Sequence, residues 1–320
     1  MKHYEVVALG ELLIDLTQNG LSAQGNPILE ANPGGAPCNV LAMLQKLGHS
    51  TAFLGKVGAD GFGDQLERAL VETGISTRGL CRDTAVHTTL AVVHTLPDGD
   101  RDFSFYRDPG ADTRLSVQEL DENMIRTCRL FHFGSLSMTN EPVRSATRQA
   151  IAIAEQAGVL RSFDPNLREP LWPGLEAARA QILYGMAHCD ILKISDNELL
   201  WLTQEKDFDD GIRWIRDRFP QIRLILLSLG KDGSRAYSGD ITARMPACQV
   251  DTIETTGAGD TFFAGVLHHV LQWGLRPYSR EELEQMLSFA NAAAAIVTTR
   301  KGALRVMPEE AEVRALMARG

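Results

Sequence analysis

Short apolar runs along the chain alternate with longer segments in which apolar residues recur at helical spacing. The apolar runs predict buried strands at residues 6–9, 12–16, 130–133, 159–163, 191–194 and 222–227. The helical spacing predicts helices at residues 39–47, 142–156, 175–187, 261–273 and 280–298. Strands that alternate with helices are typical of an α/β fold with a mostly parallel sheet and helices on both faces. We therefore expect one α/β domain over residues 1–320.

The segment 88–106 has a different pattern. Leu90, Val92, Phe103 and Phe105 alternate with polar neighbours on either side of a turn at residues 97–99, which reads Pro-Asp-Gly. This alternation predicts an antiparallel hairpin with one face in water. Together with residues 11–35, the segment 86–108 is expected to form a small β-sheet that covers a site as a lid.

Composition and charge narrow the classes of function. The formal net charge of -9 offers no excess of cations for nonspecific binding to nucleic acid or to an anionic membrane. The five cysteines are scattered and lack the spacing of a zinc or redox motif, which is typical of reduced thiols in the cytosol. The sequence shows neither a signal peptide nor an apolar run long enough to span a membrane. We expect a cytoplasmic protein.

The sharpest local motif is residues 255–260, which read TTGAGD and run directly into the helix predicted from residue 261. Two glycines at the start of a helix let the backbone approach a ligand and present free N–H groups to an anion. Asp260 has two interpretations of equal weight: a base beside a bound phosphoryl group, or a carboxylate that stabilises the helix dipole. A carboxylate at this position is expected to be a weak base, which suits a loose phosphoryl-transfer transition state.

Further polar clusters follow the predicted strands. The sequence lacks the G-x-x-x-x-G-K-[ST] phosphate loop, so a nucleotide would need another site. Residues 228–233 (SLGKDG), residues 164–168 (DPNLR), and Lys193 with Glu198 all lie at the ends of predicted strands. Each cluster alone is typical of an ordinary loop. Because ligands of open parallel sheets bind outside the carboxyl ends of the strands, the clusters together predict a site.

Two separated motifs resemble the signatures of the ribokinase-like PfkB carbohydrate kinases. Residues 34–39 read GGAPCN, with Gly48 and Gly58 further along, and resemble the first motif of that family. Residues 255–260, followed by Ala264 and Gly265, resemble the second. The resemblance runs along essentially the whole chain. It implies the ribokinase-like fold and the use of ATP and Mg²⁺ to phosphorylate a sugar hydroxyl.

The resemblance also implies roles for individual residues. Asp260 would be the base, and the amides of Gly257, Ala258 and Gly259 would form an anion hole. Glu198 would hold magnesium through water, although Ser195 replaces the asparagine that usually begins its motif. The sugar would be bound by Asp15, Gly34, Gly35, Asn39 and Asp260. The nucleotide would be bound by Lys193, Ser228, Gly230, Gly233, Gly257, Gly259 and Asn291. Glu254, where the family usually has aspartate, is the candidate for a monovalent cation site, with potassium as the ion.

Residues 105–112, which read FYRDPGAD, resemble the fructokinase branch of the family. Arg107 would then reach the sugar from the lid, and Arg168 would reach the sugar or the phosphate. We therefore expect fructose as the acceptor. A 2-keto-3-deoxygluconate kinase, a kinase of aminoimidazole riboside or another nucleoside-like sugar, and a non-catalytic sugar sensor are the alternatives. An exposed edge of the lid sheet would allow a homodimer.

Overall fold

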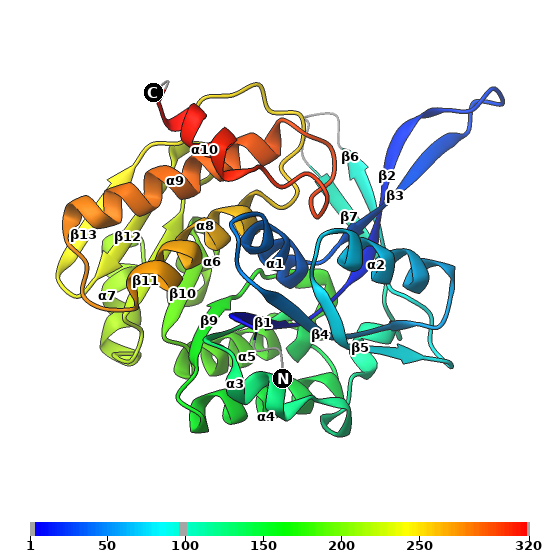
Figure 1. Ribbon diagram of the computed structural model, residues 1–320, viewed down its shortest axis with the longest axis horizontal. Coiled ribbons are helices and arrows are strands. Elements are labelled where there is room, and N and C mark those ends of the chain that lie inside the picture. Colours follow the sequence, from blue (N-terminus) through cyan, green and yellow to red (C-terminus); the bar gives the residue numbers. More distant parts are fainter. Residues whose placement is uncertain (1–3, 96–100, 319–320) are drawn as a thin grey trace.

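The computed structural model describes residues 4–95 and 101–318, and within these residues the chain forms a large central sheet and a small separate sheet (Figure 1). The central sheet has nine strands in the order β13-β12-β11-β10-β9-β8-β1-β4-β5. Its strands are β1 (Val6–Leu9), β4 (Thr51–Gly58), β5 (Ser76–Asp83), β8 (Leu130–Gly134), β9 (Leu160–Asp164), β10 (Ile191–Ser195), β11 (Leu224–Ser228), β12 (Ser234–Ser238) and β13 (Ile241–Met245).

The inner strands of this sheet pair in parallel, as the apolar runs predicted. β5, β4, β1, β8, β9, β10 and β11 are parallel neighbours, whereas β12 and β13 complete one edge in antiparallel pairing. All four residues of β1 and all eight residues of β4 are buried. Parallel strands covered on both faces are expected to read as continuous apolar runs. The prediction of a mostly parallel sheet is confirmed.

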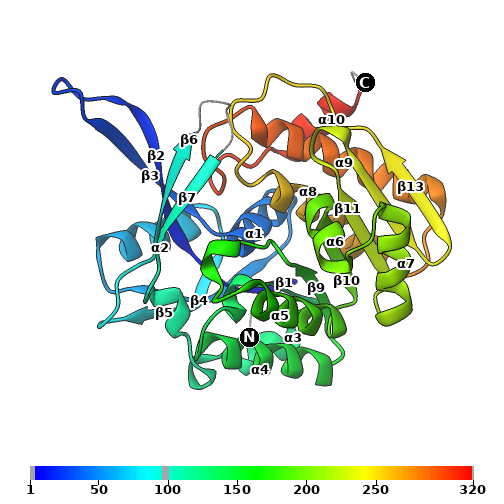
Figure 2. The same cartoon turned by 180° about the vertical axis from the view of Figure 1, so that it is seen from behind.

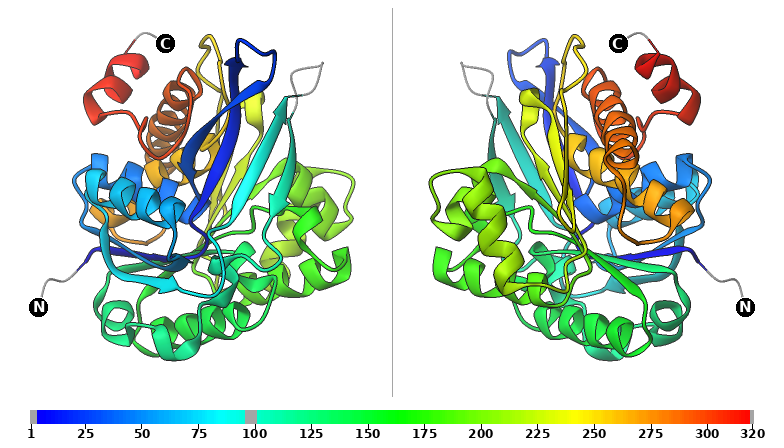
Figure 3. Two further views of the ribbon diagram at one scale, coloured as in Figure 1. Left: turned by 90° about the vertical axis from the view of Figure 1, so that its right-hand side faces the viewer. Right: turned by 90° about the vertical axis from the view of Figure 1, so that its left-hand side faces the viewer.

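Helices cover both faces of the central sheet (Figure 3). One layer contains α1 (Ala36–Lys46), α2 (Gly61–Glu72), α8 (Ala258–Trp273), α9 (Arg280–Thr298) and α10 (Glu310–Met317). The other contains α3 (Glu122–Thr127), α4 (Val143–Gln156), α5 (Leu175–Ala187), α6 (Asp196–Thr203) and α7 (Phe208–Arg218). Each layer packs its apolar face on the sheet, so the molecule has two separate hydrophobic cores. No helix in the described ranges has the length and apolar character needed to cross a membrane.

The small sheet has the order β3-β2-β6-β7 and lies beside the carboxyl ends of the central strands (Figures 1 and 2). Its strands are β2 (Leu13–Leu21), β3 (Pro27–Gly34), β6 (Leu90–Thr95) and β7 (Arg101–Tyr106). β2 pairs in parallel with β6, while β2–β3 and β6–β7 are antiparallel hairpins. The outer half of the β2–β3 hairpin projects from the body as an arm (Figure 1).

The small sheet matches the segments predicted for a lid, and the predicted hairpin is confirmed. The turn predicted at residues 97–99 lies outside the described residues. All five cysteines are free thiols, as expected. Whether the small sheet opens and closes over a site stays a prediction.

Candidate active site

A cavity of about 860 Å³ lies where the small sheet meets the carboxyl ends of the central strands. It is bounded by β2, the start of α1, the loop after β9, Lys193 of β10 and the start of α8. Of the residues that the sequence singled out, its walls contain Asp15, Gly35, Asn39, Arg168, Lys193, Glu254, Gly257, Gly259 and Asp260. The structure therefore brings together residues that are up to 245 positions apart, from Asp15 to Asp260.

The amino end of α8 forms one wall of this cavity. Gly257 precedes the helix with φ 77°, a conformation in which a Cβ atom would be strained and would lie 2.8 Å from the Cβ of Ala303. A Cβ on Gly259 would lie 3.2 Å from the Nζ of Lys193. The two glycines thus let Ala303 and Lys193 approach the first turn closely. The first-turn N–H groups of a helix and its dipole favour an anion at this position.

Asp260 lies in this first turn, half-buried, and lines the cavity. The side-chain amide of Asn39, on α1, donates a hydrogen bond of 2.8 Å to its Oδ2. Burial raises the pKa of Asp260 above its usual value, although Asn39 and the positive charges of Lys193 and Arg168 act in the opposite direction. The expectation of a weak base is therefore wrong, because loss of hydration outweighs the groups that favour the ionised carboxylate. A raised pKa makes Asp260 a better proton acceptor.

Lys193 is buried in the middle of β10, and its Nζ lies close to Gly259 in the first turn of α8. Its Nζ lies 2.9 and 3.1 Å from the two carboxylate oxygens of Asp164, at the end of β9. Burial would lower the pKa of Lys193, but the charges of Asp164, Glu198 and Asp260 raise it. Burial raises the pKa of Asp164 to about 6 against the pull of Lys193. Lys193 is thus held as a cation beside the amino end of α8.

Glu198 lies in the first turn of α6 (Asp196–Thr203), next to this pair. Its Oε1 accepts the N–H of Leu167 at 2.7 Å, and its Oε2 accepts the N–H and the hydroxyl of Ser195 at 2.9 and 2.8 Å. Burial would raise its pKa, but Lys193 and these donors lower it. Ser195 and Glu198 form a capping box, so Ser195, although it replaces the usual asparagine, still orients the carboxylate of Glu198.

The contacts of Glu198 are compatible with a magnesium ion that is bound mainly by water and phosphate. Among residues 4–95 and 101–318 there is no group of three or more His, Cys, Asp or Glu side chains that could hold a metal together. Magnesium usually keeps several waters and binds one or two carboxylates together with substrate phosphates. Glu198, whose oxygens already accept protein donors, fits the predicted contact through water.

The remaining predicted nucleotide contacts form a second cluster beyond the walls of the cavity. Ser228 ends β11 and pairs in register with Ser195 of β10. Gly230 and Gly233 follow in the turn to β12, with φ of 54° and 96°. Asn291, on α9, accepts the hydroxyl of Ser234 at 2.9 Å and donates to the carbonyl of Pro246 at 3.0 Å. The turn after β11 and α9 are thus joined beside the metal-side residues, and their contact with a nucleotide stays a prediction.

The end of the cavity beside the small sheet, where the sugar is predicted to bind, contains two carboxylates. Asp15, on β2, lies beside Gly34, where a Cβ would be 2.2 Å from its Oδ2. Glu11, which the sequence reasoning missed, is 3% exposed and lines the cavity. Its Oε1 accepts the N–H of Ala36 at 2.8 Å, and burial raises its pKa to about 7. Its position directly after the buried strand β1, at a carboxyl end, was the signal that could have identified it.

The two predicted arginines differ in position. Arg168 lines the cavity, and its charge acts on Asp260. Arg107 is 6% exposed and directs its guanidinium away to Asp112, Thr139 and the carbonyl of Leu136. The predicted contact of Arg107 with the sugar has no support in this geometry, because each of its three guanidinium nitrogens already donates to a group of the protein.

Glu254 joins the loop before α8 to the end of the chain. Its Oε1 accepts the hydroxyl of Thr256 at 2.6 Å, and its Oε2 accepts the N–H of Gly302 at 3.1 Å. Its role at a monovalent cation site stays a prediction.

Comparison with known proteins gives the family. The profile of a family described as "pfkB family carbohydrate kinase" matches residues 4–310. This chain belongs to the pfkB family of carbohydrate kinases. A protein named probable fructokinase-2, from Arabidopsis thaliana, is 42% identical to it over 313 residues, which are 96% of this chain and 94% of that protein.

Two solved structures of fructokinases have the same fold. The structure of fructokinase with bound ATP from Xylella fastidiosa has a TM-score of 0.89 and 30% identity, and covers 99% of both chains. A double mutant of fructokinase from Vibrio cholerae O395, bound to fructose, ADP and potassium ion, has a TM-score of 0.86 and 28% identity, and covers 99% of this chain and 100% of that one. The predicted membership of the PfkB family is thus confirmed.

Proposed function

We propose that this pfkB-family protein transfers the γ-phosphoryl group of ATP to fructose and forms fructose 6-phosphate. The observation that carries the proposal is the position of Asp260. Its carboxylate lines the cavity in the first turn of α8, is held by Asn39 and lies near the buried cation Lys193. The similarity to fructokinases over almost the whole chain supports fructose as the acceptor.

The residues of the site would have separate roles in the phosphoryl transfer. Asp15, Gly35 and Asn39, which line the cavity, would hold the sugar hydroxyls together with Gly34, which lies beside Asp15, and with Arg168. Asp260 would take the proton of the 6-hydroxyl as that oxygen forms its bond to phosphorus and the bond from phosphorus to the leaving oxygen of ADP breaks. The amino end of α8 and Lys193 would stabilise the charge on the transferred group. Positioning is the main source of rate in such a reaction.

The nucleotide would lie along the strand ends towards the turn after β11. Lys193, Ser228, Gly230, Gly233 and Asn291 would line its site. Glu198 would hold magnesium through water, and the ion would neutralise the phosphates of ATP. Potassium would bind beside Glu254, in the loop before α8.

The small sheet would act as the lid of this site. Closure would remove water, which otherwise competes with the sugar for the phosphoryl group. We also propose that the sheet joins two copies of the chain as a homodimer, because its arm exposes Leu21, Ile28 and Leu29. Light scattering over a range of concentrations tests this state, and a monomer at all concentrations would contradict it.

The test of function is release of ADP from ATP and magnesium in the presence of one sugar at a time. The panel contains fructose, ribose, 2-keto-3-deoxygluconate and aminoimidazole riboside. We expect the highest kcat/KM with fructose. A higher kcat/KM with another member would overturn fructose as the acceptor, and no ADP release with any member would favour the sugar sensor.

A further inference from the structure

The base of the β6–β7 hairpin is held by a buried ion pair. Arg107 directly follows β7, and its Nε donates to Oδ2 of Asp112 at 2.7 Å. The other guanidinium nitrogens donate to the Thr139 hydroxyl and the Leu136 carbonyl, both at 2.9 Å. The side chains of Arg107 and Asp112 are 3% and 1% exposed. Arg107 therefore joins the end of the hairpin to the segment after β8.

Asp112 also holds the other end of the hairpin. Its Oδ1 accepts the hydroxyl of Thr89, the residue before β6, at 2.5 Å. The N–H of Ala111 donates to the carbonyl of His87 at 2.9 Å. Gly110 makes this close approach feasible, because a Cβ there would lie 1.9 Å from the Thr89 hydroxyl oxygen. One carboxylate thus binds the residues that flank both strands.

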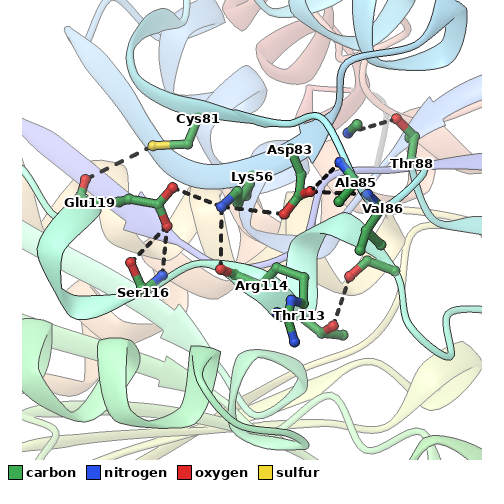
Figure 4. A network of polar contacts seen from close by, with 12 residues as sticks. Lys56, Cys81, Asp83, Ala85, Val86, Thr88, Thr113, Arg114, Ser116 and Glu119 are labelled. Carbon is green, nitrogen blue, oxygen red and sulfur yellow. Dashed lines mark hydrogen bonds and ion pairs between the residues drawn. The ribbon is translucent and has the colours of Figure 1, made fainter.

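The segment that enters the hairpin is fixed as well (Figure 4). Asp83, at the end of β5, accepts the N–H groups of Ala85 and Val86 at 2.9 and 3.0 Å. Lys56 bridges Asp83 and Glu119 from β4, at 3.4 and 2.7 Å. These contacts place the hairpin base on the rigid edge of the central sheet.

This base lies directly behind the sugar end of the cavity. Phe105, which is on β7 two residues before Arg107, lines the cavity from the small sheet. Leu136, whose carbonyl accepts from Arg107, lines it from the body. Glu11, another wall residue, is close enough to feel the charges of both Arg107 and Asp112. Arg107 therefore connects two parts of the wall, one on the small sheet and one on the body.

We propose that Arg107 and Asp112 are positioning residues that fix the small sheet, through Phe105 and Leu136, at the spacing needed to bind the sugar. The proposal rests on the proposed function for its kinetic consequence. Arg107 then acts on sugar binding through these neighbours instead of touching the sugar. Removal of either partner alone leaves a buried group without its counter-charge, which is the costly change for a buried pair.

A double-mutant cycle tests the pair. The variants are Arg107→Met, Asp112→Asn and the combination of the two. We expect each single change to raise the KM for fructose by about 10-fold or more, with a much smaller change in the KM for ATP. The double variant should be no worse than the worse single variant, because the two residues act as one unit. If Asp112→Asn leaves the KM for fructose unchanged while Arg107→Met raises it, direct contact of Arg107 with sugar is correct and the proposal is wrong.

Thr89→Val gives a gentler test if a charged-pair variant does not fold. It removes one hydrogen bond to Asp112 and leaves the ion pair in place, so we expect a smaller rise in the KM for fructose in the same direction. The matched control is Asp190→Asn. Asp190 pairs with Arg161 at 3.1 Å at the amino ends of β9 and β10, and the two side chains are each 13% exposed. It should lower stability and leave both KM values unchanged; a rise in the KM for fructose here would mean that destabilisation alone explains the effect.

Hydrogen exchange without ligands separates this proposal from the proposed function. In Asp112→Asn, the backbone amides that pair β6 with β7 and β2 with β6 should exchange faster than in the wild type, while those of β8 and β9 should not. This result would support the positioning role even if the wild type phosphorylated none of the sugars tested. Unchanged exchange in the small sheet would overturn it.

Discussion

The central sheet and the small sheet differ in how much of each is buried. In the central sheet, β1 and β4 are buried throughout, and two layers of helices cover the faces. In the small sheet, the outer halves of β2 and β3 are exposed, and Leu21 and Leu29 are 62% and 45% exposed. The central sheet and its helices thus supply stability and fix the positions of Lys193, on β10, and Asp260, on α8. The small sheet supplies a cover, and the cavity lies where the two meet.

A core substitution in the central sheet should have the largest effect on stability. Phe131, on β8, is fully buried and stacks on Phe133 with ring centroids 6.0 Å apart. Phe131→Ala removes this packing and leaves a cavity, so we expect the free energy of unfolding to fall by about 3–5 kcal/mol. Urea unfolding measures the change. Phe131→Leu, which keeps most of the volume, should cost much less, and equal losses for the two variants would contradict a closely packed core.

A buried histidine should make the central sheet sensitive to acid. His132, on β8, is 1% exposed and bonds the Ser162 hydroxyl at 3.0 Å, and burial lowers its pKa to about 3. Because the unfolded chain takes up this proton near pH 6.5, its contribution to stability is complete above that pH. It is lost as the pH falls from 6.5 towards 3, by about 1.4 kcal/mol per pH unit.

The test of this sensitivity is the free energy of unfolding between pH 6.5 and pH 5. His132→Asn removes the titrating group but keeps a side chain that can bond Ser162. In the variant, unfolding should take up about one proton fewer than in the wild type, so the free energy of unfolding should depend less steeply on pH. An unchanged slope would mean that His132 is not held neutral.

A substitution in the arm of the small sheet should have the smallest effect on stability. Leu29 is exposed on β3, so Leu29→Ser should change the free energy of unfolding of the monomer by less than about 0.5 kcal/mol. Thermal unfolding at low protein concentration measures this. A loss similar to that of Phe131→Ala would show that the arm is packed against something and would remove the contrast between the sheets.

The same contrast explains which elements the sequence predicted. β8, β10 and β11 form where the sequence has short apolar runs, whereas the equally buried β4 was not predicted, because glycines and Lys56 interrupt its apolar residues. β12 and β13 were not predicted, since they are short, carry polar residues and form at the edge of the sheet. The β6–β7 hairpin was predicted because apolar and polar residues alternate along its two strands.

The candidate site was predicted where residues belong to a compact motif. The start of α8, the residues after β9 and Lys193 of β10 meet at the cavity because the carboxyl ends of parallel strands share one edge. Glu11 was missed because a single carboxylate after a strand has no distinctive spacing. The partners of Arg107 could not be predicted from the sequence either, since its contacts with Asp112 and Thr139 depend on tertiary packing. The raised pKa of Asp260 likewise depends on burial that a motif does not reveal.

The most direct test of the account is the turnover of Asp260→Asn with fructose and ATP, together with the binding of both ligands measured by calorimetry. Asparagine keeps the shape of the side chain and an oxygen that can accept from Asn39, but it cannot take the proton. We predict that kcat falls by about 10²–10⁴-fold while both ligands bind within a few fold of the wild type. A kcat within a few fold of the wild type would contradict Asp260 as the base and with it the proposed mechanism.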